Sequence, residues 1–189
     1  MPFDDHARQL FALGWQARAD GDYEKSEQYF DEIEKFVRES EYKEYFTAYG
    51  ESYLLYSQAV AKAHLCKTEE AELLFKRALL LEKGVSSKYS TNTGKRLFEM
   101  SNMYYDIGNY ESATKYFKEG IEVLDKSNYE KKDPIGVART LDMYANSLDK
   151  SGGDPAEIAR VRERAELLRR ENPEKQALTI TPSYPTSCP

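Results

Sequence analysis

The sequence predicts an all-α fold of about four helical hairpins, eight helices in all. A set of residue types returns along the chain: a turn residue, then a polar or aromatic residue, a small residue and a phenylalanine. The copies read Gly21, Tyr23, Ser26 and Phe30; Cys66, Thr68, Ala71 and Phe75; and Gly108, Tyr110, Ala113 and Phe117. A small residue one turn from a large one leaves a hole beside a knob on one helix face, where a second helix can dock.

The positions before each turn extend the pattern into the first helix of every hairpin. They are Leu10, Leu13, Gly14 and Ala17; Leu55, Gln58, Ala59 and Lys62; Leu97, Met100, Ser101 and Tyr104; and, in a degenerate fourth copy, Leu141, Tyr144, Ala145 and Leu148. This arrangement resembles the tetratricopeptide repeat (TPR). The resemblance implies a right-handed α-solenoid of about four TPR-like hairpins in a domain over residues 1–172. Its repeats would span about 7–40, 52–85, 94–127 and 138–172.

The spacing of the repeats is longer than usual. The small positions Ser26, Ala71, Ala113 and Ile158 are 45, 42 and 45 residues apart, whereas a typical repeat of this family has about 34 residues. Longer helices and longer links between hairpins must supply the difference. The period is similar to that of repeats in kinesin light chains and in bacterial peptide-sensing regulators, but no motif singles out either family.

The first two hairpins are expected to contain four helices. The first helix should run from Phe3 to Ala19, and the second from after Asp22 to near Arg38. Aromatic residues recur at helical spacing between positions 42 and 56, which predicts one long helix over residues 40–65. Thr68 is expected to cap the next helix, which should end at Gly84.

The last two hairpins are predicted mainly from their caps. A Ser/Thr/Asn/Gly-rich link over residues 85–94 should lead into the fifth helix, and Asn109 should cap the sixth. Asp133 and Asp154 each stand directly before a proline, which is the pattern of an N-cap followed by proline at the first helical position. The last helix, over residues 155–171, has a narrow apolar stripe among many arginines and fits the terminal cap of a solenoid.

The final residues, 173–189, are predicted to form a disordered, flexible tail. They contain four prolines among Ser and Thr residues, with a single Tyr184. A solvated end and a short linear motif are both compatible with this composition. Because Cys188 belongs to this tail and Cys66 to a turn, the two cysteines are expected to be unpaired thiols.

Composition excludes several classes of function. The net charge is −6 and the charged residues are interleaved, which favours neither nucleic acid nor anionic membrane as a partner. The chain has no apolar run of about 20 residues and no signal-peptide core, so a cytoplasmic protein is expected. No enzyme motif is present, and His64 with Cys66 falls short of a zinc site. We therefore expect no enzyme activity, no cofactor and no metal.

The candidate binding site is the concave face of the predicted solenoid, which the first helix of each hairpin should line. The resemblance places inward the second, fifth, ninth and twelfth positions of each such helix. The candidate partner-binding residues are Arg8, Phe11, Trp15, Arg18, Tyr53, Tyr56, Lys95, Phe98, Asn102, Tyr105, Arg139 and Asn146, and the same register adds Val60, Ala63, Asp142 and Asp149. The aromatic residues could line apolar pockets, and Asn102 and Asn146 could pair with the backbone of an extended peptide.

These residues predict a non-enzymatic adaptor or scaffold that binds a protein or an extended peptide. A second hypothesis is a structural or neutralising partner, such as an assembly scaffold or an immunity-type protein, which binds a folded domain by its convex face. A third is one part of a peptide-responsive regulator. A homodimer through the first helix is also compatible with the sequence, because Phe3, Leu10 and Phe11 have no preceding repeat to cover them.

Overall fold

The computed structural model describes residues 5–39, 47–85, 90–178 and 183–186, and this part of the chain is helical without a β-strand. The helices are α1 (Asp5–Ala19), α2 (Tyr23–Glu39), α3 (Ala48–His64), α4 (Thr68–Val85), α5 (Thr91–Asp106), α6 (Tyr110–Ser127), α7 (Tyr129–Lys132), α8 (Pro134–Lys150) and α9 (Pro155–Glu171). The predicted all-α fold of successive helical hairpins is confirmed.

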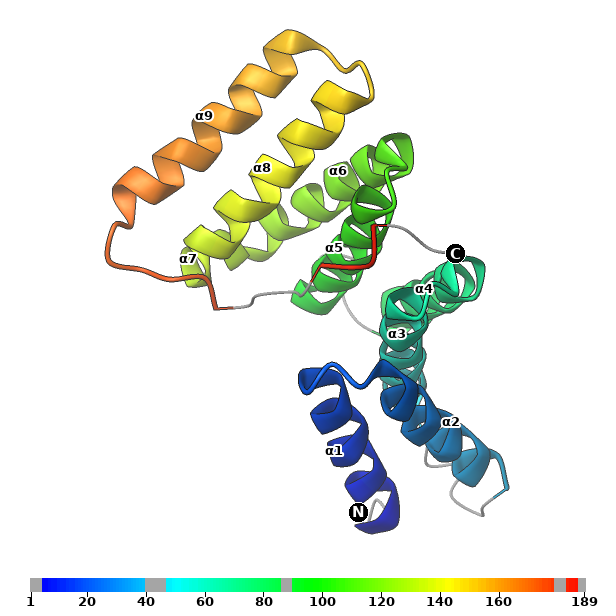
Figure 1. The fold of residues 1–189 in the computed structure, drawn as a ribbon. Helices are drawn as coiled ribbons and strands as arrows, with labels where there is room; N and C mark the ends of the chain where they lie inside the picture. The colour runs from blue at the N-terminus through cyan, green and yellow to red at the C-terminus, as the bar shows by residue number, and fades with distance from the viewer. Residues whose placement is uncertain (1–4, 40–46, 86–89, 179–182, 187–189) are drawn as a thin grey trace. The chain divides into compact units, whose positions relative to one another are not determined.

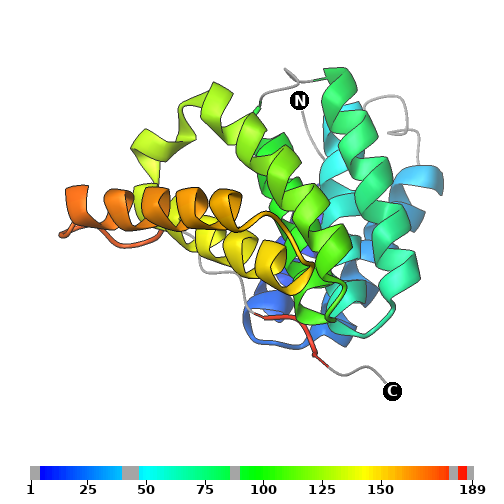
Figure 2. The ribbon, with the colours of Figure 1, turned by 90° about the horizontal axis from the view of Figure 1, so that it is seen from above.

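The helices divide between two compact units, which we call unit 1 (Met1–Val85) and unit 2 (Ser86–Cys188). Unit 1 contains the hairpins α1/α2 and α3/α4, and α2 also packs against α3. Unit 2 contains the hairpins α5/α6 and α8/α9, and α6 also packs against α8. Both views show α8 and α9 running side by side (Figure 1, Figure 2). A single domain over residues 1–172 stays a prediction.

The same turn geometry closes all four hairpins. The turn residues Gly21, Cys66, Gly108 and Gly152 have φ values of 78°, 61°, 82° and 76°. In each turn the next residue donates its N–H to the carbonyl five positions earlier, as from Asp22 to Ala17 at 2.8 Å and from Gly153 to Leu148 at 2.7 Å. This is the Schellman motif, which glycine favours because it has no Cβ. The recurring glycine of the sequence pattern therefore ends the first helix of a hairpin.

The small and large positions of the pattern interlock as the sequence predicts. Phe30, Phe75 and Phe117 are fully buried. A Cβ on Gly14 would lie 2.8 Å from the Phe30 ring, so only a residue without a side chain fits there. The fourth repeat has Arg162 where the others have phenylalanine, and its core is instead made by the aliphatic residues Leu124, Val137, Leu141, Ala165 and Leu168 together with Ala138.

Two predicted helix starts are wrong, and one helix was missed. The third helix begins at Ala48, not at Ser40, because Thr47 caps it by accepting the N–H of Gly50 at 3.2 Å; residues 40–46 lie outside the described part. The predicted link to Gly94 is too long, because Ser90 accepts the N–H of Thr93 at 3.1 Å and starts α5 earlier. The short helix α7 follows Asn128, whose φ of 54° ends α6.

The tail also departs from its prediction. Tyr184 is 2% exposed, so this residue is not part of a solvated end. Leu178 donates its backbone N–H to Asp133 at 3.2 Å. Cys66 is disulfide-bonded, so the prediction of a free thiol is wrong for this residue. That prediction assumed that the tail is solvated. Cys188 lies outside the described residues.

Candidate partner-binding surfaces

Four of the predicted site residues form a row of aromatic rings in unit 1. This aromatic row consists of Phe11 and Trp15 on α1 and Tyr53 and Tyr56 on α3. The ring centroid of Tyr53 lies 5.9 Å from that of Phe11, 5.6 Å from that of Trp15 and 6.5 Å from that of Tyr56. Tyr53 is 36% exposed and the other three are half-buried. The row therefore exposes the edges of aromatic rings at the surface of unit 1.

The base of the aromatic row is the core of the two hairpins. Phe30 lies 6.1 Å from Phe11 and 5.9 Å from Trp15 between ring centroids, and Phe75 lies 6.1 Å from Tyr56. Since Phe30 and Phe75 are fully buried, their packing restricts the rings above them. The row therefore has a structural role as well as exposed edges.

Charged residues flank the aromatic row. The guanidinium carbon of Arg18 lies 4.9 Å from the centre of the Trp15 ring, within reach of a cation–π interaction. Arg8 lies on α1 and is exposed.

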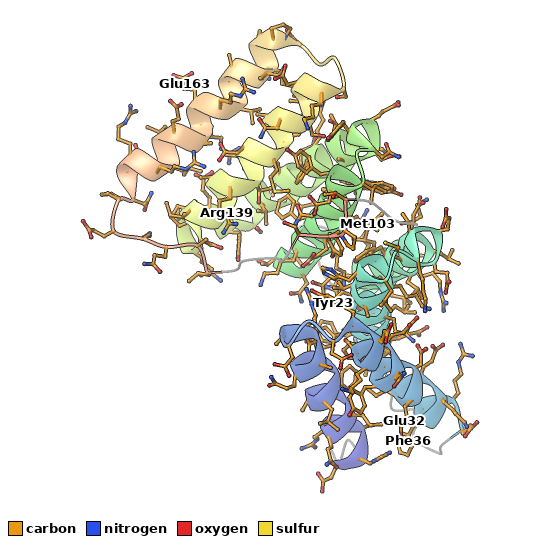
Figure 3. The ribbon with its side chains drawn as sticks, in the orientation of Figure 1. Tyr23, Glu32, Phe36, Met103, Arg139 and Glu163 are labelled. Carbon is orange, nitrogen blue, oxygen red and sulfur yellow. The ribbon has the colours of Figure 1, made fainter. Side chains whose placement is uncertain are left out.

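His64 is buried and stacks on Tyr23, labelled in Figure 3, with 3.8 Å between the ring centroids. Burial, aided by the charge of Arg18, lowers the pKa of His64 to about 4, so the imidazole is neutral at pH 7.

The α5 face of unit 2 holds four predicted residues. Phe98 and Tyr105 are half-buried, and each ring centroid lies 6.5 Å from that of Phe117. Asn102 is half-buried, and its side chain makes no hydrogen bond within the described residues. Its carboxamide keeps both donor and acceptor capacity for a partner. Lys95 is exposed, with its ammonium 5.8 Å from the centre of the Tyr129 ring.

Three of the four α8 positions of the same register are already engaged by α9. Arg169 pairs with Asp142. Arg162 approaches Asn146 Oδ1 at 3.5 Å and Asp149 Oδ2 at 3.4 Å. The predicted equivalence of Asn102 and Asn146 is thus limited, because only Asn102 lacks a hydrogen bond within the described residues. Arg139, labelled in Figure 3, is exposed on α8.

Other predicted residues are not available at a surface. Val60 and Ala63 are buried, so they line no groove. Leu10 belongs to the buried core of the first hairpin, and Phe3 lies outside the described residues. Among the three residues of the predicted dimer edge, only the half-buried Phe11 remains. Dimerisation through α1 stays a prediction.

Unit 1 also has a pocket of about 220 Å³ that sequence reasoning missed. It lies among α2, α3 and α4 and is lined by Glu34, Val37, Arg38, Glu51, Leu54, Leu55 and Arg77. Its charged groups pair internally: Arg38 bonds Glu34, and Arg77 lies 3.7 Å from Glu51. These pairs leave little net charge to attract an ionic ligand.

Two further surfaces were missed by the sequence analysis. Leu73 and Leu80 on α4 are 61% and 73% exposed. Their spacing of seven residues places them on one helix face, a signal that the sequence already contains. The second is the contact of Tyr184 with α5, which no local pattern indicates.

The described residues contain no group of three or more His, Cys, Asp or Glu side chains that could hold a metal ion. Among the described helices, none has the length and apolar character to cross a membrane.

Comparison with known proteins shows a likeness of fold alone. No protein-family model matches the sequence, and no curated protein matches it. Among solved structures, BtubC (BKLC) from P. vanneervenii aligns with 94% of this chain and 68% of its own, at a TM-score of 0.77 and 14% identity. The MamA protein aligns with 94% of this chain and 99% of its own, at a TM-score of 0.51 and 11% identity. The helical-repeat fold is thereby supported.

Proposed function

We propose that this protein is a non-enzymatic interaction module of the TPR type that binds a protein or an extended peptide. The aromatic row of unit 1 is the observation that carries this proposal. Binding hot spots are enriched in Trp, Tyr and Arg. Trp and Tyr bury large areas at low entropic cost, and Arg adds hydrogen bonds and cation–π contacts. The row contains Trp15 and two tyrosines, and Arg18 lies over Trp15. This composition suits an apolar anchor of a partner.

The geometry supports a pre-formed site. The rings rest on buried Phe30 and Phe75, so little side-chain order has to be gained on binding. In unit 2, Asn102 supports recognition of an extended backbone, because its carboxamide makes no bond within the described residues. We therefore assign apolar anchoring to the aromatic row of unit 1 and, as a separate contact, backbone pairing to Asn102 of unit 2.

A matched pair of tyrosines on α3 tests the proposal. Tyr53 belongs to the aromatic row, whereas Tyr49 lies one turn earlier and is 47% exposed. Wild type, Tyr53→Ser and Tyr49→Ser proteins would be used to capture partners from the lysate of the source cell, with identification by mass spectrometry. We expect a partner that wild type and Tyr49→Ser retain and Tyr53→Ser loses. Equal recovery on all three would contradict a site at the row.

The exposed leucines of α4 favour a second function, binding of a folded domain to the second helix of a hairpin. Leu73 and Leu80 are the most exposed large aliphatic residues on the described helices, and their position on one helix face suits an apolar contact with a partner. A Leu73→Ser/Leu80→Ser variant separates the two functions. Loss of the partner from this variant, with retention by Tyr53→Ser, would favour the scaffold or neutralising role.

A further inference from the structure

Tyr184 is the least expected buried residue of the chain. It belongs to the segment Ser183–Thr186, which has no regular secondary structure, yet its side chain is 2% exposed. Figure 1 shows this segment in red where it crosses α5. The segment and its hydrogen-bond partners on α5 all belong to unit 2. A large ring on a coil segment is buried this completely only where the rest of the protein provides a site that fits it.

Two carboxylates of α5 bind Tyr184 at both of its hydrogen-bond donors. The phenol donates its O–H to Glu99 Oε2 at 2.8 Å, and the backbone N–H donates to Asp106 Oδ2 at 2.7 Å. Glu99 and Asp106 are seven residues apart, so they lie two turns apart on one face of the helix. Hydrogen bonds to ionised acceptors are about twice as strong as neutral ones. We call Glu99 and Asp106 the tyrosine slot.

The slot also selects for backbone conformation. Tyr184 precedes Pro185, and a residue before proline is biased toward an extended backbone. The backbone N–H of Tyr184 bonds the side chain of Asp106, so it does not take part in a helix or a sheet. An isolated extended segment meets this requirement. Burial raises the pKa of Asp106, while the hydrogen bond from the Tyr184 N–H opposes that rise. Asp106 is thus desolvated and depends on this donor.

We propose that the tyrosine slot on α5 is a recognition site for a tyrosine within an extended peptide, and that the chain's own Ser183–Thr186 segment occupies it. The segment acts as a tethered competitor, because a short tether gives an effective concentration of the order of millimolar. A peptide of the same chemistry on another molecule binds only when the segment is displaced. The slot belongs to unit 2 and the aromatic row to unit 1, so the Tyr53→Ser test of the row and the test of the slot can fail independently.

The slot distinguishes tyrosine from its close analogues. A phenylalanine would keep the ring but remove the donor to Glu99, and a desolvated acceptor without its donor is costly. A phosphorylated tyrosine would place negative charge beside Glu99 and be expelled by repulsion. The ligand class is therefore an unmodified tyrosine in an extended segment.

Fluorescence anisotropy with a labelled peptide tests the proposal on the full-length protein. The peptide reproduces residues 180–186 and omits Cys188, which avoids thiol exchange. We expect the Tyr184→Ala protein, whose slot is empty, to bind it at least tenfold more tightly than wild type. A peptide with phenylalanine at the tyrosine position should bind at least fivefold more weakly. Equal affinity of wild type and Tyr184→Ala, or of the two peptides, would overturn the proposal.

Variants of the slot provide the matched comparison. In the Tyr184→Ala background, Glu99→Ala should abolish binding of the peptide, whereas Glu122→Ala, at an exposed position of α6, should leave it unchanged. Retention of binding by the Glu99→Ala variant would contradict the assignment of Glu99. Circular dichroism would verify that each variant remains helical.

Hydrogen exchange gives a second readout that does not need Tyr184→Ala to fold. In wild type, the Tyr184 amide should exchange at least tenfold more slowly than in an unstructured peptide, because it is bonded to Asp106. Glu99→Ala should accelerate this exchange, and Glu122→Ala should not. An amide that exchanges in wild type at the unstructured rate would refute occupancy by the tail.

Discussion

The two units place different chemistry at the same positions of the repeat. In unit 1 four of the eight positions are aromatic, and Tyr53 contacts both Phe11 and Trp15. In unit 2, Arg162 and Arg169 of α9 engage the α8 positions. A shared backbone register therefore sets where side chains lie, while their neighbours decide whether they remain available to a partner.

The largest effect on stability should come from the buried phenylalanine that recurs in the core of each unit. Phe30→Ala and Phe117→Ala each remove a fully buried ring, and we expect each to lower the free energy of unfolding by about 4 kcal/mol. Arg162 takes this place in the fourth repeat and is exposed, so Arg162→Ala should cost less than about 1 kcal/mol. Urea unfolding measures all three. A loss under about 2 kcal/mol for either phenylalanine would contradict the shared register.

The stability lost when an ion pair is broken should differ between the two units. Glu27 binds Lys62 and Lys67 at 2.7 Å each, and the Glu27 and Lys62 side chains are only 12% and 15% exposed. Burial favours a higher pKa for Glu27, but the two lysines hold it below its usual value. Glu27→Ala would leave Lys62 with only Glu70, whose side chain is 62% exposed, and we expect a loss of about 2 kcal/mol in urea unfolding.

The corresponding ion pairs of unit 2 provide the control. Arg164 bonds Asp125 and Glu130, whose side chains are 44% and 36% exposed. Solvent screens such pairs, so Asp125→Ala should change the free energy of unfolding by less than about 1 kcal/mol. Equal losses for Glu27→Ala and Asp125→Ala would remove this distinction between the units.

The pH dependence of stability should be a property of His64 in unit 1. Its pKa falls from 6.5 to about 4 on folding, chiefly through burial. Between these values the unfolded chain binds more protons than the folded one, so stability is lost as the pH falls. From about pH 7.5 to about pH 5.0 we expect His64 to account for a loss of about 2 kcal/mol in chemical denaturation.

The other histidine is the matched control for this measurement. His64→Gln should remove the part of the pH dependence that is due to the buried imidazole. His6 has a side chain that is 50% exposed, and His6→Gln should retain the wild-type dependence. The same pH profile for both variants would show that burial of His64 is not the cause.

The smallest expected effect is the loss of partner affinity when one of the two asparagines of unit 2 is replaced. Asn102 makes no bond within the described residues, whereas Asn146 lies near Arg162. Once a partner has been captured, Asn102→Ala should weaken its binding five- to tenfold, or about 1 kcal/mol. Asn146→Ala should weaken it less than twofold. Titration calorimetry measures both, and equal losses would favour one uniform peptide face instead.

Local sequence signals predicted most helix ends and the core. The turn glycines required positive φ, the aspartates before Pro134 and Pro155 capped α8 and α9, and the small positions accommodated Phe30 and Phe117. These signals act within one or two helical turns, which is why one sequence can reveal them. The start of α3 was missed, because the aromatic period continues past the Thr47 cap.

The candidate site was predicted less completely. In the structure the ring of Tyr53 lies against those of Phe11 and Trp15, which occupy the register positions of the adjacent hairpin; their role in binding stays a prediction. The register did not foresee that Val60 would be buried or that Arg162 would reach Asn146. Such outcomes depend on the length and direction of side chains from other helices, which spacing along the chain does not encode.

The sequence by itself determined the helical hairpins, their turns and the residues that fill their cores, because caps, glycines and apolar spacing act locally. Only the tertiary structure decided which polar groups were satisfied and where the tail lay. Glu27 with Lys62, and Tyr184 with Glu99, are 35 and 85 residues apart in sequence. Their contacts form only when packing brings distant segments together, and burial then makes each charge or donor depend on its partner.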